Sequence, residues 1–277
     1  MEIKKTIKRL EKNNGVIHLC GNFVRYIHTE INKGKQFPGE VYRGLGLKQD
    51  SFVPLKWLKN KYDGERCFII ATGPSLREED VLALENEYTF GMNSVCKLFE
   101  RIAWQPTFFG IQDLFVYDNL SEKINLATNS IVFIGENIAR KRMIDAKWVR
   151  FPLNTAYNEY AQYVKGKFPV KFSDNCYKTV YNGYSITFSL LQIAVYLGFK
   201  EIYLLGADCS FSSKGKNHFA EHGHEDARIE TAQARNFAMY ECAKAYCEAV
   251  GVSIYNSTRG GELEIFPRID FDSIIKK

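Results

Sequence analysis

The sequence predicts an α/β fold in which a Rossmann-like parallel sheet carries helices on both faces. Two observations support this. From about residue 65 onward, short apolar runs alternate with longer helical patterns, as in chains that build a parallel sheet. The apolar runs are also nearly continuous, which is typical of strands covered on both faces.

The first predicted strand is Arg66–Thr72, which contains a continuous apolar run and is ended by Gly73-Pro74. A helix is expected to begin near Ser75, because Ser75 and Glu78 form the Ser-x-x-Glu pattern of a capping box. The remaining strands are expected at residues 88–92, 107–111, 130–135, 201–206 and 252–255.

Two long helices are predicted in the second half of the chain. Residues 184–197 are apolar nearly all round and end at Gly198, which indicates a deeply buried helix. Residues 227–250 form a longer helix that ends at Gly251. We therefore expect a helical extension over 1–64, a sheet domain over 65–256 with a lid loop at about 209–226, and a tail over 257–277.

Composition limits the class of protein. The chain has 277 residues, of which 45% are hydrophobic and 25% charged, as in ordinary globular proteins. No apolar run approaches the roughly 18 residues of a membrane span, and no secretory signal is evident. The seven cysteines are odd in number and scattered without a Cys-x-x-Cys pair, so reduced thiols are expected. These features favour a cytoplasmic protein.

The net charge of +5 comes from a local excess of basic residues at the start of the chain and again at Lys56, Lys59 and Lys61, before the predicted core. Basic residues cluster at Lys4, Lys5, Lys8, Arg9 and Lys12, beside a short apolar stripe. The cluster is either the solvated face of a helix or a peripheral contact with an anionic membrane surface. No nucleic-acid-binding motif accompanies it.

Polar residues follow the predicted strands. In sheets of this type, ligands bind at the carboxyl ends of the strands. Gly73-Pro74-Ser75 lacks the full pattern of a P-loop or of a dinucleotide fingerprint, but backbone N–H groups at a helix start attract phosphate. The residues expected along this edge are Thr72, Gly73, Ser75, Asn93, Gln112, Asp113 and Asp208.

Three of the five histidines lie within residues 217–226, above the predicted edge. One interpretation is general acid/base chemistry, since imidazole titrates near neutral pH. A second is a metal site, because His218-x-x-Glu221-His222 matches the inverzincin pattern. The third is an inert surface turn. We rank acid/base chemistry first, and we interpret Asp270-x-Asp272 as solvated or as the cap of a terminal helix.

Several of these motifs, in this order, resemble the bacterial sialyltransferases of glycosyltransferase family 42. They also resemble a related domain from surface-polysaccharide and flagellin-glycosylation loci that is likened to archaeal pterin pyrophosphokinases. The resemblance spans about Arg66 to Tyr255. It rests on Gly73-Pro74-Ser75-Leu76, Asn93, residues 197–208 ending in Gly206-Ala207-Asp208, and residues 218–222.

The resemblance implies a GT-A-like variant of the Rossmann-like fold and a metal-independent, inverting transferase. His222 would be the general base with His218 beside it, and the nucleotide-sugar donor would be a co-substrate rather than a cofactor. Phosphate and ribose contacts fall on Gly73, Ser75 and Asn93. The cytidine-side contacts fall on residues Tyr184, Ser185 and Thr187.

This sequence departs from the family pattern at three places. The family carries a tyrosine after the Gly-x-Asp strand and another in the lid, where this chain has Cys209-Ser210-Phe211 and Ser212-Ser213-Lys214. An arginine before the buried helix is replaced by Gly183. Lys214 or Lys216 is our candidate for steadying the departing phosphate.

The resulting hypothesis is a bacterial glycosyltransferase that uses CMP-sialic acid or a related CMP-sugar to build a cell-surface glycan, such as lipopolysaccharide or capsule. Homo-oligomers are compatible with it. The main alternative is an Mg²⁺-dependent pyrophosphokinase-like phosphotransferase, with Asp113, Asp208 and Glu221 as candidate metal ligands. The third hypothesis is a nucleotide-binding subunit without catalysis.

Overall fold

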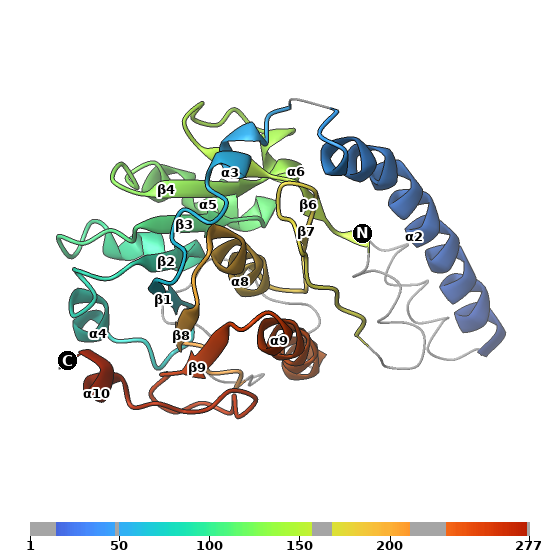
Figure 1. Cartoon of the computed structure of the whole chain (residues 1–277). Coiled ribbons are helices and arrows are strands. Elements are labelled where there is room, and N and C mark those ends of the chain that lie inside the picture. Colours follow the sequence, from blue (N-terminus) through green and yellow to red (C-terminus); the bar gives the residue numbers. More distant parts are fainter. Residues whose placement is uncertain (1–14, 48–49, 157–167, 211–230, 276–277) are drawn as a thin grey trace.

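A seven-stranded parallel sheet forms the centre of the molecule (Figure 1). The computed structural model describes residues 15–47, 50–156, 168–210 and 231–275. The strand order is β5-β4-β3-β2-β1-β8-β9, and neighbouring strands pair in parallel. The strands are β1 Arg66–Ile70, β2 Thr89–Met92, β3 Phe108–Ile111, β4 Ile131–Gly135, β5 Val149–Phe151, β8 Glu201–Leu205 and β9 Ser253–Asn256. This confirms the predicted fold class and six of the strands; β5 was not predicted.

Helices cover both faces of the sheet. Phe108 and Phe109 are neighbours in β3, and both are fully buried, but they belong to core clusters on opposite faces, as the period of two in a strand requires. The helical elements are α2 Gly15–Gly44, α3 Val53–Trp57, α4 Glu78–Leu82, η1 Asn93–Leu98, α5 Leu114–Ile124, α6 Glu136–Ala139, α8 Ile186–Leu197, α9 Ala232–Ala249 and α10 Phe271–Ile275.

The strand order places a switch point between β1 and β8. The chain runs from β1 outward through β2, β3, β4 and β5, then returns to add β8 and β9 on the other side of β1. The helix after β1, α4, packs into one core cluster through Val81, and the helix after β8, α9, packs into the other through Met239. The two connections therefore diverge at the carboxyl ends of β1 and β8, where ligands bind in folds of this type.

The predicted helix start at Ser75 is wrong. Residues 74–75 form a turn, and α4 begins only at Glu78, with Arg77 as its N-cap and no side-chain capping hydrogen bond. The capping box does not form because the Ser75 hydroxyl donates instead to the carboxylate of Asp208, at 2.8 Å. A long-range contact has displaced the local one.

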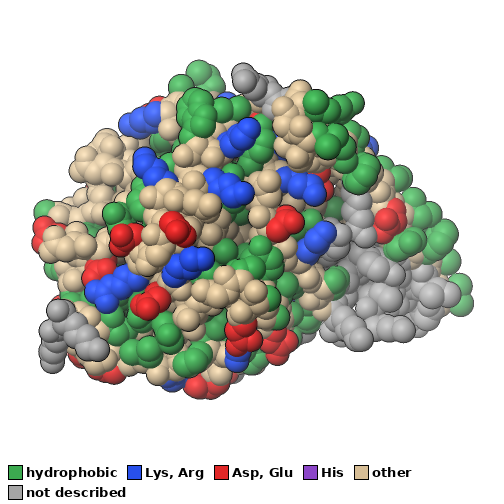
Figure 2. Space-filling view, viewed as in Figure 1, with side chains coloured by type: hydrophobic (Ala, Val, Ile, Leu, Met, Phe, Trp, Pro, Cys, Tyr) green, Lys and Arg blue, Asp and Glu red, His purple; other side chains and the backbone are tan. Residues whose placement is uncertain are grey.

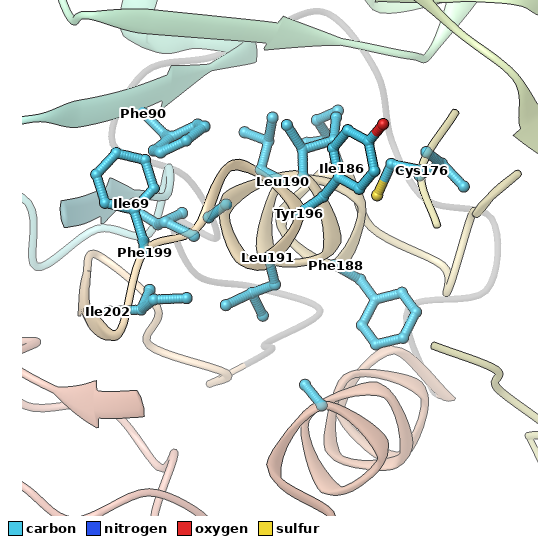
Figure 3. Packing of buried hydrophobic residues seen from close by; sticks show 14 of the residues in the cluster. Ile69, Phe90, Cys176, Ile186, Phe188, Leu190, Leu191, Tyr196, Phe199 and Ile202 are labelled. Atoms are coloured by element: carbon cyan, nitrogen blue, oxygen red, sulfur yellow. The ribbon is translucent and has the colours of Figure 1, made fainter. Parts of the chain in front are cut away.

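The prediction of a deeply buried helix is confirmed by α8. Eleven of its twelve residues are buried, all except Val195, and Gly198 ends the helix with φ of +105°. Figure 3 shows Leu190, Leu191 and Phe188 pointing from α8 in different directions into the core. Since α8 also contacts α9, it fills the centre of one layer.

Two short strands, β6 Leu153–Asn154 and β7 Val180–Tyr181, form a second parallel sheet beside β5 and α8. The sequence analysis did not predict them. Gln192 of α8 holds this sheet in place: its amide nitrogen donates to the Tyr181 carbonyl at 2.7 Å, and its amide oxygen accepts from the Tyr181 N–H at 3.0 Å.

The C-terminal segment packs against the sheet. Leu263 and Phe266 are buried in the same core cluster as α8. Asp270 accepts a hydrogen bond from the Ser273 N–H at 3.1 Å, which confirms its interpretation as a cap of a terminal helix. Asp272 pairs with Arg259 at 2.6 Å, and Arg259 also holds Asp80 of α4 at 2.8 Å.

The predicted N-terminal helical extension contains α2 and α3. The last turns of α2 are attached to the body: Arg43 donates two hydrogen bonds to the Lys178 carbonyl at 2.8 and 2.9 Å, and Glu40 accepts one from Asn154 at 2.9 Å. Among the described residues, no helix is long and apolar enough to cross a membrane.

We predict that Gly110→Ala destabilises the protein. A Cβ at this position of β3 would lie 2.6 Å from a methyl carbon of Leu190, which is itself fully buried in α8. Overpacking of this kind costs about 1–3 kcal/mol of the free energy of unfolding, to be measured by urea denaturation. Gly34→Ala in α2 is the matched control, because nothing lies within 4 Å of its added Cβ. Equal stability of the two variants would contradict the packing.

Candidate functional site

The polar residues predicted for the site follow the carboxyl ends of four strands. Thr72, Gly73 and Ser75 follow β1, Asn93 follows β2, Gln112 and Asp113 follow β3, and Gly206 and Asp208 follow β8. The start of α8 lies at the same edge, because Thr187 contacts the Met92 sulfur at 3.3 Å at the end of β2. One edge of the sheet therefore gathers the predicted residues of the described chain.

At the switch point, Asp208 follows β8, and its side chain lies against the turn that follows β1. Its carboxylate accepts hydrogen bonds from both the hydroxyl and the backbone N–H of Ser75. A Cβ on Gly73 would lie only 1.9 Å from this carboxylate, so the close approach requires glycine. The Gly73 N–H donates to the Gly206 carbonyl at 2.8 Å. The donors predicted to hold a phosphate thus hold a carboxylate of the same chain.

The environment of Asp208 affects its protonation. Its side chain is 6% exposed, and burial raises the pKa of the carboxyl group above its ordinary value. The hydrogen bonds from Ser75 act in the opposite direction but do not offset burial. The charged form of Asp208 is therefore less favourable here than it is for an aspartate in water.

Asn93 and Ser94 present polar atoms without partners. Asn93 has a left-handed backbone, with φ of +47°, directly after β2. The Asn93 Oδ1 and Ser94 Oγ atoms are buried and have no hydrogen-bond partner. Buried polar atoms are rarely left unpaired in folded proteins, so these two atoms make the carboxyl edge after β2 a candidate for contact with a ligand.

The sequence analysis missed three further residues with the same property. Glu136 Oε2 and Asn137 Oδ1 follow β4, and Ser257 Oγ follows β9; each is buried and unpartnered. The signal that identified Asn93 would have found them, since each is among the first polar residues after a strand. In the described part of the chain, all such unpartnered side-chain atoms lie at the carboxyl edge.

Gln112 and Asp113 have structural partners. The Gln112 amide donates to Asn182 Oδ1 at 2.7 Å and accepts from the Ser189 hydroxyl at 2.6 Å, which ties β3 to α8. Asp113 is the N-cap of α5 and accepts from the Val116 N–H at 3.0 Å. Both residues shape the edge through these contacts.

The start of α8 is a tightly built corner. Ser185 is the N-cap and accepts a hydrogen bond from the Thr187 N–H at 3.2 Å. Tyr184 has φ of +73° and lies 6.0 Å from the Arg235 guanidinium. A Cβ on Gly183 would lie 2.0 Å from the Phe188 ring, so glycine is required where the resembled family has arginine.

Backbone strain is concentrated at this edge. Four non-glycine residues in the described chain have positive φ, and three of them, Asn93, Tyr184 and Cys209, follow β2, precede α8 and follow β8. The fourth is Asn60, at the opposite end of β1. Strained residues cluster at binding and catalytic sites because the surrounding structure must hold them.

His218 and His222 lie outside the described residues, as do Lys214, Lys216 and most of the predicted lid. Their roles stay predictions. Within the described residues, no group of three or more His, Cys, Asp or Glu side chains is arranged to hold a metal ion. Of the carboxylates predicted for a Mg²⁺ site, Asp113 caps α5, Asp208 binds Ser75, and Glu221 is not described.

The fold is that of a doubly wound α/β protein, and its predicted site residues gather at the carboxyl edge of the sheet. The model of the family described as "6-hydroxymethylpterin diphosphokinase MptE-like" matches residues 48–214, more than half of the chain. The chain therefore belongs to this MptE-like family, as the predicted resemblance to the related domain implied. No curated protein matches the sequence.

Two of the solved structures that the chain resembles are described as a glycosyltransferase and a sialyltransferase. The MAf glycosyltransferase from Magnetospirillum magneticum AMB-1 matches with a TM-score of 0.50 and 15% identity, over 80% of this chain and 38% of that one. The chain thus spans well under half of that protein. The sialyltransferase CstII from Campylobacter jejuni, in complex with cytidine-5'-monophosphate, matches with a TM-score of 0.43 and 16% identity, over 75% of this chain and 85% of that one.

We predict that Asp208→Asn alters how stability depends on pH. An acid whose pKa is raised in the folded state loses stability as the pH rises from the unfolded pKa, about 3.9, through the folded one. The wild-type protein should therefore lose stability relative to the variant over this window in urea denaturation. Asp118→Asn is the control with the opposite sign, because the hydrogen bond from Arg142 lowers the pKa of Asp118. Parallel pH profiles for the wild type and Asp208→Asn would contradict the assignment.

Proposed function

We propose that this protein is a glycosyltransferase that binds a nucleotide-activated sugar, a CMP-linked one, along the carboxyl edge of its sheet. It transfers the sugar to an acceptor of a cell-surface glycan. The observation that carries the proposal is the set of unpartnered buried polar atoms after β2, β4 and β9. The motif order shared with family 42 sialyltransferases and the glycosyltransferase fold support the same class of reaction.

The chemistry of these atoms fits such a donor. Asn93 Oδ1, Glu136 Oε2 and Asn137 Oδ1 are hydrogen-bond acceptors, so the ligand must bring donor groups. Ribose and sugar hydroxyls and the exocyclic amine of cytosine are such groups. The ends of β2 and β4 lie two strand spacings apart, about 10 Å, so a ligand that serves both must be longer than a phosphate.

His222 acts as the general base in the proposed reaction. It takes the proton of the acceptor hydroxyl as the oxygen forms a bond to the anomeric carbon. The bond from that carbon to the phosphate oxygen breaks, and CMP leaves with the electron pair, so the configuration inverts. His218 assists the base, and Lys214 or Lys216 balances the charge of the departing phosphate. The reaction needs no metal ion in this proposal.

A second candidate follows from family membership. The description of the family names a diphosphokinase, and transfer of a diphosphate requires Mg²⁺ held by oxygen ligands. Asp113 Oδ1 accepts from the Val116 N–H and Asp208 Oδ2 accepts from the Ser75 hydroxyl, and the other oxygen of each carboxylate would be the candidate ligand.

Calorimetric titration separates the two candidates. CMP, UMP and ADP are titrated into the full chain, each with and without Mg²⁺. The glycosyltransferase predicts binding of CMP that does not need the metal. Binding of ADP that requires Mg²⁺ would reject it in favour of the diphosphokinase, and binding of none of the three would reject both.

We predict that Asn93→Gly weakens CMP binding by about tenfold or more, because one buried acceptor to the ligand is lost. Glycine accepts the positive φ, so the variant should keep its fold. Asn60→Gly is the matched control, since Asn60 has φ of +54° but lies away from the edge. Equal affinities of the two variants would exclude Asn93 from the site.

We predict that His222→Ala lowers the transfer rate by about 10²–10⁴-fold while CMP affinity is kept, as expected for loss of a general base. His224→Ala, two residues away, is the control and should retain most of the rate. If His222→Ala is fully active, the base lies elsewhere. If the wild type binds CMP but transfers no sugar to any acceptor, the protein is the non-catalytic nucleotide-binding subunit instead.

A further inference from the structure

Helix α2 carries a long row of exposed apolar side chains. Val16 is 71% exposed, Phe23 63% and Val24 65%. Figure 2 shows hydrophobic side chains gathered along this helix, at the side of the molecule. The other exposed apolar residues of this segment are Tyr26, Ile27, Ile31, Phe37, Tyr42, Leu45 and Leu47. Apolar surface of this extent on one element marks an interaction site.

The apolar residues form one stripe that faces away from the body of the protein. With about 3.6 residues per turn, positions 16, 23, 27 and 31 fall on the same side of the helix. Arg43 and Glu40 fall on the opposite side, and they are the residues whose hydrogen bonds attach α2 to Lys178 and Asn154. The attachment of α2 therefore leaves its apolar stripe outward.

The net charge of the protein lies in the same segment. Residues 1–47 contain nine Lys and Arg and four Asp and Glu, a net charge of +5. The whole chain has 37 basic and 32 acidic residues, also +5, so residues 48–277 are neutral as a group. The exposed apolar stripe and the excess positive charge are thus carried by one part of the chain.

The composition of α2 also requires something to cover it. Gly21, Gly34, Pro38 and Gly39 lie inside the helix. Glycine and interior proline both disfavour a helix relative to alanine, so intrinsic propensity does not sustain this helix in water. Burial of the stripe in an apolar medium would supply the missing stabilisation.

We propose that α2 is a membrane-binding helix that lies in the plane of an anionic lipid surface, with its stripe at the boundary between headgroups and acyl chains. A surface helix of this kind combines an apolar face with basic residues that are attracted to anionic lipid. The positive charge favours an anionic lipid surface over a second copy of this chain as the partner of α2. Two copies of residues 1–47, each with a net charge of +5, would repel each other. The inference does not depend on the proposed catalytic activity.

Sedimentation with lipid vesicles tests the proposal. The full chain should bind vesicles of phosphatidylcholine mixed with phosphatidylglycerol, bind phosphatidylcholine alone more weakly, and be released from the mixture by salt. The double variant Phe23→Glu and Ile27→Glu should lower the partition coefficient by about tenfold or more. The control is Met143→Glu, because Met143 is 97% exposed outside α2 and should leave binding unchanged.

Cys20 reports on the stripe itself. It is the one cysteine classed as exposed, whereas five are buried and Cys242 is partly buried, so a thiol-reactive polarity-sensitive dye labels it selectively. Its emission should shift to the blue when mixed vesicles are added. Absence of binding and of this shift would overturn the proposal. So would equal binding to both kinds of vesicle, or a dimer in solution that the double variant abolishes.

Discussion

The burial of α8 against the parallel sheet is the interaction on which the rest of the structure depends. Eleven of its twelve residues are buried, so its few polar side chains must find partners inside the protein. Gln192 does so with the backbone of Tyr181, and Ser189 with the side chain of Gln112. These contacts attach the small second sheet and the end of β3 to one helix. The packing of α8 therefore also determines the shape of the carboxyl edge of the sheet.

The same constraint explains why the candidate site lies where it does. A sheet covered on both faces leaves its polar chemistry to the strand ends, where the backbone leaves the hydrogen-bonded ladder. At the carboxyl ends the chain accepts left-handed residues at Asn93 and Cys209 and buries the polar atoms of Ser94 and Ser257 without partners. These features reduce stability, and a ligand that brings donor groups would recover it. A glycosyltransferase site and a diphosphokinase site would both use this edge.

The contact between Ser75 and Asp208 joins the turn after β1 to the segment after β8. The turn after β1 has hydrogen-bond donors that hold the Asp208 carboxylate, and burial raises the pKa of this carboxyl group. Protonation or displacement of this carboxylate would free the hydroxyl and N–H of Ser75 for another anion. In the proposed function, the charge of Asp208 would therefore determine whether the Ser75 donors are free for a ligand. Helix α2, at the side of the molecule, presents exposed apolar side chains instead of polar ones.

Most of the fold follows from the sequence by itself, because a strand buried on both faces is apolar along most of its length and a deeply buried helix is apolar on most of its sides. The runs at β1, β2, β3, β4 and β8 and the helix α8 follow this rule, whereas the edge strand β9 has Ser253 and Asn256 at its ends. Local pattern failed where tertiary contacts override it. Ser75 bonds Asp208, 133 residues away, instead of capping a helix, and β6 and β7 are too short to leave a periodic signal. Which polar atoms lack partners, as at Glu136 and Asn137, was also decided only by the tertiary structure, since partnership depends on what folding brings within hydrogen-bond distance.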